Sequence, residues 1–154
     1  MTINLAIGGG SYQLQEYVKN QLVPSAISFF QSTLKVIQTV GPLVVQEPCG
    51  GLYPSLDLMI NGIETDLIIL VTAGVYEESF VAAAMPCGLD DNTYRPVYGV
   101  IYFNLKYMST DSTTALQENL STTLHEMTHI LGFASDLYYL YINPLTGQTI
   151  DPVG

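Results

Sequence analysis

Positive charge is scarce in this sequence. Its 154 residues contain four Lys and Arg against fourteen Asp and Glu, which gives a formal net charge of −10. The four cations are spread along the chain, at Lys19, Lys35, Arg95 and Lys106. Binding to nucleic acid depends on clustered cations that neutralise phosphates. We therefore expect no nucleic-acid partner, and the same scarcity disfavours an anionic membrane surface.

Charge of either sign and long apolar runs are also rare. Only 12% of residues are charged and 48% are hydrophobic, whereas disordered tails and coiled coils need more charge or low complexity. No stretch reaches the roughly 18 apolar residues of a spanning helix, and the first ten residues do not read as a secretory leader. The length fits one packed domain. The cellular compartment stays open, because the sequence resembles the interior of a longer chain.

The sequence has only two cysteines. Cys49 and Cys87 each follow a proline and precede a glycine, which is typical of loops. Loop cysteines suit an oxidising compartment better than a reducing one. The two could be bonded to each other, bonded to residues outside this sequence, or free.

Apolar periodicity predicts the secondary structure. Residues 14–37 carry apolar side chains mostly three and four apart, which indicates a helix that Pro24 divides into a short first part and a main second part. Residues 35–40 are rich enough in β-branched side chains to begin a strand. The continuous apolar run at residues 66–72 is typical of a central strand buried on both faces.

A second strand is predicted at residues 97–104, where Gly99 marks a bulge or a close backbone approach. Between the two strands, residues 85–96 are rich in turn formers. The sequence shows no internal repeat. Helices interspersed with strands, without strict alternation, predict a fold of the α+β or mixed α/β class.

The strongest helix is predicted at residues 115–131, after capping side chains at residues 111–114 and before Gly132. It contains His125-Glu126-Met127-Thr128-His129, which has the form H-E-x-x-H. Residues four apart on a helix face the same way, so both imidazoles can bind one metal ion. Glu126 can then reach a water on that metal, and three ligands plus a water is the usual catalytic zinc arrangement.

The alternative is that these histidines are ordinary core or surface residues. The helix has one apolar stripe, and His125 and His129 lie on roughly the opposite side from it. The stripe comprises Leu116, Leu120, Leu124, Met127, Ile130 and Leu131. These two histidines are the only ones in the chain, and a glutamate lies between them in the required place. The context therefore favours a metal site over a solvated polar face.

The longer string from His125 through Gly132 to Phe133 resembles the metzincin signature, in which the glycine turns the chain so that a third histidine approaches the metal. In short-spaced metzincins that histidine would stand at position 135, which is Ser135 here, and no histidine follows. With this departure, the sequence resembles leishmanolysin, a metzincin family in which an insertion displaces the third histidine far downstream. Residues 84–87, 95–104 and 24–36 are similar to other stretches of that family.

The resemblance implies an α+β metzincin-like zincin subdomain, with a mixed twisted sheet, a backing helix and a long active-site helix. It implies a zinc metalloendopeptidase in which His125 and His129 bind Zn²⁺ and Glu126 is the general base toward the metal-activated water. Peptides or proteins would be the substrates. Residues 97–104 would be the edge strand that pairs with an extended peptide, through Gly99, Val100, Ile101 and Tyr102.

The third zinc ligand and the methionine turn of the family have no counterpart in the sequence. Asp136 or Asp151 could act as a carboxylate ligand instead. We expect residues 1–154 to be the N-terminal part of a catalytic domain, completed by a missing C-terminal part of the same chain or by a partner subunit. The alternative is a catalytically incomplete segment with a structural or binding role in a larger assembly.

The resemblance also implies an extracellular or cell-surface location, and membrane association could occur through regions outside residues 1–154.

Asn119-Leu120-Ser121 has the form of an N-glycosylation sequon, but it lies within the predicted helix. We therefore expect an unmodified helical asparagine.

Overall fold

The structure is a computed structural model that describes residues 2–7 and 9–150. Four strands, four α-helices and three short helical turns follow one another in the described residues. In chain order they are β1 (Thr2–Ile7), α1 (Tyr12–Tyr17), the π-helical turn η1 (Val18–Leu22), α2 (Val23–Thr33), α3 (Leu56–Ile60), β2 (Ile68–Gly74), β3 (Ala82–Leu89), β4 (Pro96–Asn104), the 3₁₀ turn η2 (Leu105–Tyr107), α4 (Thr113–Ile130) and the 3₁₀ turn η3 (Ser135–Leu140).

The four strands form one mixed sheet in the order β1-β2-β4-β3. β1, β2 and β4 are parallel, and β3 pairs antiparallel with β4 at the edge of the sheet. Every residue of β2 is buried, as the continuous apolar run predicts for a strand with neighbours on both sides. The predicted α+β class is confirmed.

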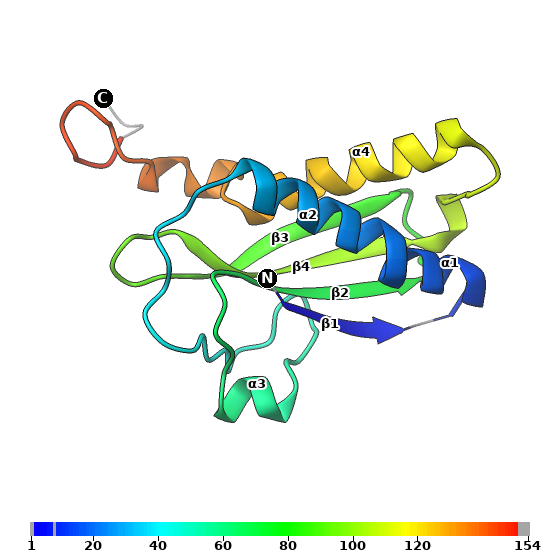
Figure 1. Ribbon diagram of the computed structural model, residues 1–154, viewed down its shortest axis with the longest axis horizontal. Coiled ribbons are helices and arrows are strands. Elements are labelled where there is room, and N and C mark those ends of the chain that lie inside the picture. Colours follow the sequence, from blue (N-terminus) through cyan, green and yellow to red (C-terminus); the bar gives the residue numbers. More distant parts are fainter. Residues whose placement is uncertain (1, 8, 151–154) are drawn as a thin grey trace.

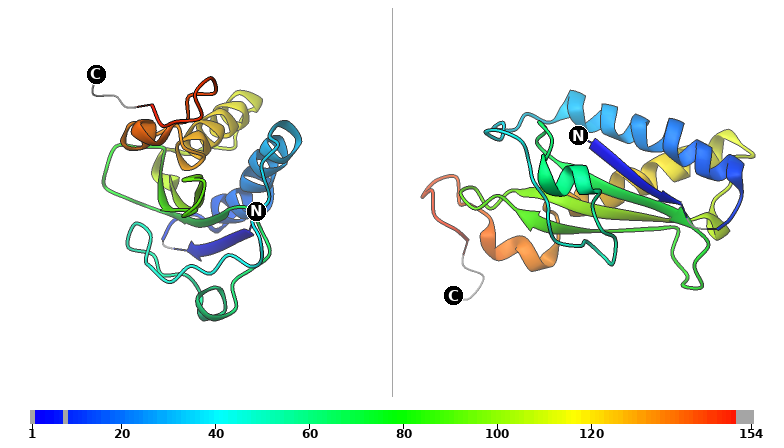
Figure 2. Two further views of the ribbon diagram at one scale, coloured as in Figure 1. Left: turned by 90° about the vertical axis from the view of Figure 1, so that its left-hand side faces the viewer. Right: turned by 90° about the horizontal axis from the view of Figure 1, so that it is seen from below.

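The chain builds three layers around this sheet. The helices α1, α2 and α4 lie on one face, and the irregular segment between α2 and β2, which includes α3, covers the other (Figures 1 and 2). Each face has its own buried apolar cluster. The larger cluster packs the sheet against the helices, through residues such as Val18, Phe30, Ile69, Ile101, Met127 and Ile130. This packing fixes α4 against the sheet.

A main helix opens near Pro24 as predicted, but no break separates it from the helical residues before it. The chain stays helical from Tyr12 to Thr33, and the π-helical turn η1 directly precedes the proline, which occupies the first turn of α2. A proline inside an α-helix lacks the N–H and collides with the carbonyl four residues earlier, and the wider π turn relieves both problems. The predicted break is therefore a local widening of one continuous helical segment.

The strand predicted at residues 35–40 is wrong. These residues are irregular, and β1 occupies the position beside β2, with Thr2 paired to Ile68. Thr39 is tied to the segment before β2, because its N–H donates to Asp66 Oδ1 (3.0 Å) and its hydroxyl donates to the Thr65 carbonyl (2.9 Å). Local β propensity does not create a strand where a segment is held by contacts of this kind instead of by a neighbouring strand.

The strand predicted at residues 97–104 is confirmed as β4, but its predicted place at the edge of the sheet is wrong. β4 lies inside the sheet, where Gly99, Val100, Ile101 and Tyr102 pair with β2 on one side and with β3 on the other. Their backbone groups are committed to these two ladders and cannot accept a peptide strand. The edge strand is β3, in a region predicted to consist of turns from residue 85 onward. Its Pro86 and Gly88 are tolerated because they lie at an edge and beside register shifts.

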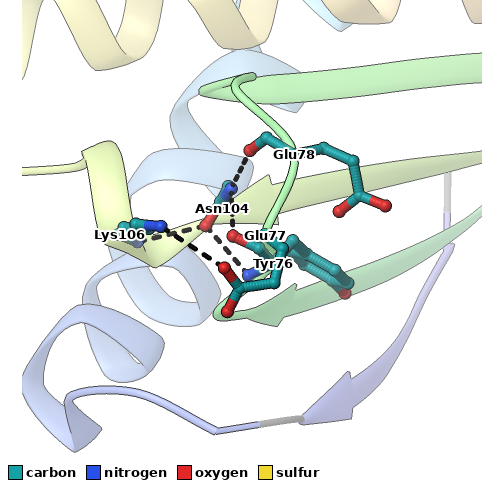
Figure 3. A network of polar contacts seen from close by, with 5 residues as sticks. All are labelled: Tyr76, Glu77, Glu78, Asn104 and Lys106. Atoms are coloured by element: carbon teal, nitrogen blue, oxygen red, sulfur yellow. Dashed lines mark hydrogen bonds and ion pairs between the residues drawn. The ribbon is translucent and has the colours of Figure 1, made fainter.

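Two features fix β3 in place. A disulfide joins Cys87 of β3 to Cys49, which is fully buried in the segment under the sheet. At the other end, the Asn104 N–H donates to the Val81 carbonyl, and the Asn104 side chain bonds to the loop after β2 (Figure 3). That side chain is fully buried. Its oxygen accepts from the N–H groups of Tyr76 and Lys106, and its nitrogen donates to the carbonyls of Tyr76 and Glu78, at 3.0–3.2 Å.

Within the described residues, no helix combines the length and apolarity required to cross a bilayer. Asn119 of the sequon is buried in α4, and its side-chain amide donates to the Ser109 carbonyl at 2.8 Å. An asparagine held in this way cannot carry a glycan in the folded state, which agrees with the expectation of an unmodified helical residue.

Candidate active site

The candidate site stands on α4. Ser112 caps the helix, because its hydroxyl accepts from the Ala115 N–H at 3.1 Å. The buried face consists of Asn119, Thr123, Met127 and Ile130. It is therefore shifted from the predicted leucine stripe, whose first member Leu116 is exposed. Two polar residues can be buried here because the Asn119 side chain bonds to Ser109 and the Thr123 hydroxyl bonds to the Asn119 carbonyl.

Gly132 ends the helix in the left-handed conformation, with φ at +116°. The Gly132 N–H donates to the His129 carbonyl, and the Phe133 N–H donates to the Thr128 carbonyl at 3.0 Å. These two bonds form a Schellman motif. The reversal brings the Phe133 carbonyl to the His129 ring, 2.8 Å from Nδ1. A carbonyl can only accept, so Nδ1 carries the proton and the Nε2 lone pair of neutral His129 is free to bind a metal ion.

The two histidines converge as metal ligands do. The Nε2 atoms of His125 and His129 are 3.2 Å apart, with their rings nearly perpendicular at 88°. Two ligands at about 2.0–2.1 Å from a tetrahedral zinc ion are about 3.3 Å apart. Two imidazole nitrogens at this separation therefore fit a shared zinc ion.

Glu126 completes the group. One ligand atom from each of His125, Glu126 and His129 lies within 4.8 Å of the others. Burial raises the pKa of Glu126 above its usual value, while the imidazoles of His129 and His125 and the Ala84 backbone N–H oppose the rise. The interaction with the Ala84 N–H, together with the packing of α4 on β3, places the carboxyl beside β3. A carboxyl with a raised pKa next to two imidazoles is suited to accept and release a proton.

The described residues hold no other such group. Among residues 2–7 and 9–150, no further His, Cys, Asp or Glu joins the three. Asp136 therefore is not the third ligand in this structure, and Asp151 lies outside the described residues. Two imidazoles and one carboxylate fit the donor types that zinc prefers.

The edge strand beside Glu126 directs backbone groups away from β4 at alternate residues. The Asn104 N–H bond to the Val81 carbonyl sets the phase of the β3–β4 ladder, so residues 81, 83 and 85 bond inward. The N–H and C=O of Ala82 and Ala84 and the C=O of Pro86 then point to the open edge. The N–H that Pro86 lacks would also point to the open edge, so its absence costs no hydrogen bond to β4.

The leishmanolysin family profile matches residues 13–145, more than four fifths of the chain. No curated protein matches it. A His-Glu-His group at H-E-x-x-H spacing on a helix is the arrangement with which many metallopeptidases hold their metal ion. The chain belongs to the leishmanolysin family, whose members are zinc-dependent metallopeptidases.

Sequence reasoning found the three residues of this group and missed the strand beside it. The structure brings His125, Glu126 and His129 together on α4, as the H-E-x-x-H spacing predicts. It places β4 one strand further from the edge than expected and gives the edge to residues 82–89. The run of three alanines followed by Met85 and Pro86 is the only local signal for that strand, because small residues can approach a neighbouring helix and proline fits an edge.

Proposed function

We propose that this chain forms the zinc-binding half of a metalloendopeptidase, in which His125 and His129 bind the metal and Glu126 acts as general base. The observation that carries the proposal is the 3.2 Å separation between the Nε2 atoms of His125 and His129. In addition, the hydrogen bond to the Phe133 carbonyl holds the His129 ring in the tautomer that can bind a metal ion. A zinc ion held there would lower the pKa of a bound water to about 7 and polarise the peptide carbonyl.

The residues of the chain supply the rest of the chemistry. The Glu126 carboxyl, whose pKa burial raises, accepts a proton from the attacking water and can return it to the leaving amine. The open edge of β3 binds the substrate backbone as an added strand, through Ala82, Ala84 and Pro86. β3 replaces Gly99 to Tyr102 of β4 as the proposed peptide-binding element.

A catalytic zinc site with three protein ligands needs one more than the two histidines provide. We propose that another part of the protein, or a partner subunit, supplies this ligand, so that residues 1–154 form part of a catalytic domain. We also propose an extracellular or cell-surface location. The disulfide between Cys49 and Cys87 supports it, since such bonds persist in oxidising compartments.

The second candidate function is a structural or binding subunit that keeps the fold without the chemistry. This second function is favoured by one observation: the described residues provide only two imidazoles as ligands for a metal ion. Metal content and dependence on Glu126 separate the two functions.

The test compares the protein as isolated with Glu126→Gln, using quantitative metal analysis and cleavage of a quenched fluorescent peptide. We expect about one zinc per chain in both proteins and a loss of about 10²- to 10⁴-fold in cleavage rate for the variant. Glu118→Gln, an exposed glutamate on the same helix, is the matched control and should retain full activity. Zinc-free protein without Glu126-dependent cleavage would refute the peptidase proposal and leave the structural role.

A further inference from the structure

A cleft of about 560 Å³ opens next to the candidate zinc site. Its lining consists of residues 84–86 of β3, His129 of α4, and residues 133–138, which follow α4. The reversal at Gly132 places residues 133–138, because the Schellman motif directs the chain back past His129. The cleft is therefore built from the same two elements that flank the site.

Strand pairing determines which part of a substrate enters the cleft. Antiparallel pairing is slightly more stable per residue than parallel pairing. In an antiparallel pair with β3, the peptide residue opposite Pro86 lies two positions upstream of the residue opposite Ala84. Because α4 packs against β3, and Ala84 lines the same cleft as His129, the scissile bond belongs near Ala84. The cleft toward Pro86 then receives side chains from the amino-terminal side of that bond.

The pleat determines where that upstream side chain points. Ala84 packs against the core on the helix side of the sheet, and Pro86, two residues further on, faces the same side. Directly opposed residues of an antiparallel pair place their side chains on the same face. The peptide side chain opposite Pro86 therefore points toward residues 133–138.

This side of the cleft combines an apolar wall with one negative charge. Phe133 and Tyr138 are exposed in it by 63% and 49%. Asp136 is the only Asp, Glu, Lys or Arg of the lining, and the Ser135 hydroxyl donates to its carboxylate at 3.3 Å. Within residues 9–150, the ion pair that forms is between Lys106 and Glu77, which leaves Asp136 without a cationic partner.

We propose that Asp136 selects a Lys or Arg side chain at the substrate position opposite Pro86, upstream of the scissile bond. Long basic side chains match both parts of the wall, because their aliphatic stems pack on apolar surface while the charged end reaches a carboxylate. An arginine can also stack on the Phe133 or Tyr138 ring. The inference deepens the proposed peptidase function and rests on it, since the upstream direction is defined by a scissile bond at Glu126.

Peptide binding tests the inference without cleavage. The full-length protein carrying Glu126→Gln is titrated into fluorescein-labelled neutral peptides in which a single Lys occupies successive positions, and fluorescence anisotropy reports affinity. An exposed ion pair contributes up to about 1 kcal/mol, so one Lys position should bind about fivefold tighter than its Gln counterpart. Asp136→Asn should abolish this preference, and Asp136→Lys should transfer it to a Glu at the same position.

Asp111→Asn is the matched control, because Asp111 is an exposed aspartate at the opposite end of α4 and should leave the Lys preference unchanged. A Lys preference that survives Asp136→Asn, or the absence of any preferred Lys position, overturns the inference. A parallel cleavage assay on protein with Glu126 intact keeps the two proposals distinct. If cleavage depends on Glu126 but the Lys preference does not depend on Asp136, this inference alone is refuted. If there is no cleavage, the peptidase proposal is refuted, and the anisotropy result decides whether Asp136 selects a cation.

Discussion

Gly99 is the contact point between β4 and α4, and replacing it by alanine should destabilise the protein. A Cβ at this position would lie 2.5 Å from Ile130 Cγ2 and 2.9 Å from the Met85 carbonyl oxygen. Ile130 is fully buried, and the Met85 carbonyl belongs to a sheet ladder, so neither can move away easily. Overpacking of this kind costs about 1–3 kcal/mol, and two simultaneous contacts place Gly99→Ala at about 2–3 kcal/mol.

Thermal unfolding followed by far-UV circular dichroism measures the effect. A loss of about 2–3 kcal/mol lowers Tm by about 4–12 °C in a domain of this size. Gly88→Ala in the neighbouring strand is the control, because its nearest contact would be the Tyr98 Cβ at 3.2 Å and it has the same unfolded-state entropy gain. We expect Gly88→Ala to cost less than about 1 kcal/mol.

A double mutant with Ile130→Ala tests the cause. Ile130→Ala alone should cost about 2–5 kcal/mol as a core truncation. If the Cβ collides with Ile130, Gly99→Ala should cost at least about 1 kcal/mol less in the truncated background. Additive effects, or a Gly99→Ala variant as stable as Gly88→Ala, would refute the close contact between β4 and α4.

Three further predictions concern the elements that hold β3 and its loops. Reducing the Cys49–Cys87 bond, which closes a separation of 38 residues, should lower the free energy of unfolding by about 2–4 kcal/mol in denaturant titrations with and without dithiothreitol. Asn104→Ala should cost about 2–4 kcal/mol in the same titration, since the fully buried Asn104 side chain bonds to four backbone groups that would lose this partner. Hydrogen bonds from the Thr93 hydroxyl and backbone lower the pKa of Asp90, so its stabilisation is present above about pH 4 and is lost as pH falls through the lowered pKa. The Tm difference between the wild-type protein and Asp90→Asn should therefore shrink below about pH 4, and a difference that grows on acidification would contradict this.

Local sequence patterns correctly predicted the helices and strands whose formation depends least on neighbouring elements. α4 has its own start and stop signals, Ser112 and Gly132, and the structure places its ends within two residues of the prediction. The 66–72 run is apolar on both faces, and such a run predicts a central strand wherever the chain places it. The H-E-x-x-H spacing works for the same reason, because the helical repeat alone brings the two imidazoles together.

The edge of the sheet could not be read in this way. Residues 97–104 and 82–89 both form strands, and their local sequences do not say which one has a neighbour on each side. β propensity at residues 35–40 was equally uninformative, because β1 takes the place beside β2. Strand order depends on contacts between residues far apart in the sequence, and the β propensity of one segment contains no information about those contacts.

The amino-acid sequence is sufficient to place the His-Glu-His group, because helix geometry fixes His125, Glu126 and His129 relative to one another within four residues. The surroundings of that group depend on the tertiary structure. It set Ala84 of β3 beside Glu126, turned the chain at Gly132 so that the Phe133 carbonyl orients His129, and placed Asp136 in the cleft. The physical reason is range: helix geometry acts over a few residues, whereas strand order and cleft shape arise when distant segments bury their apolar surfaces together.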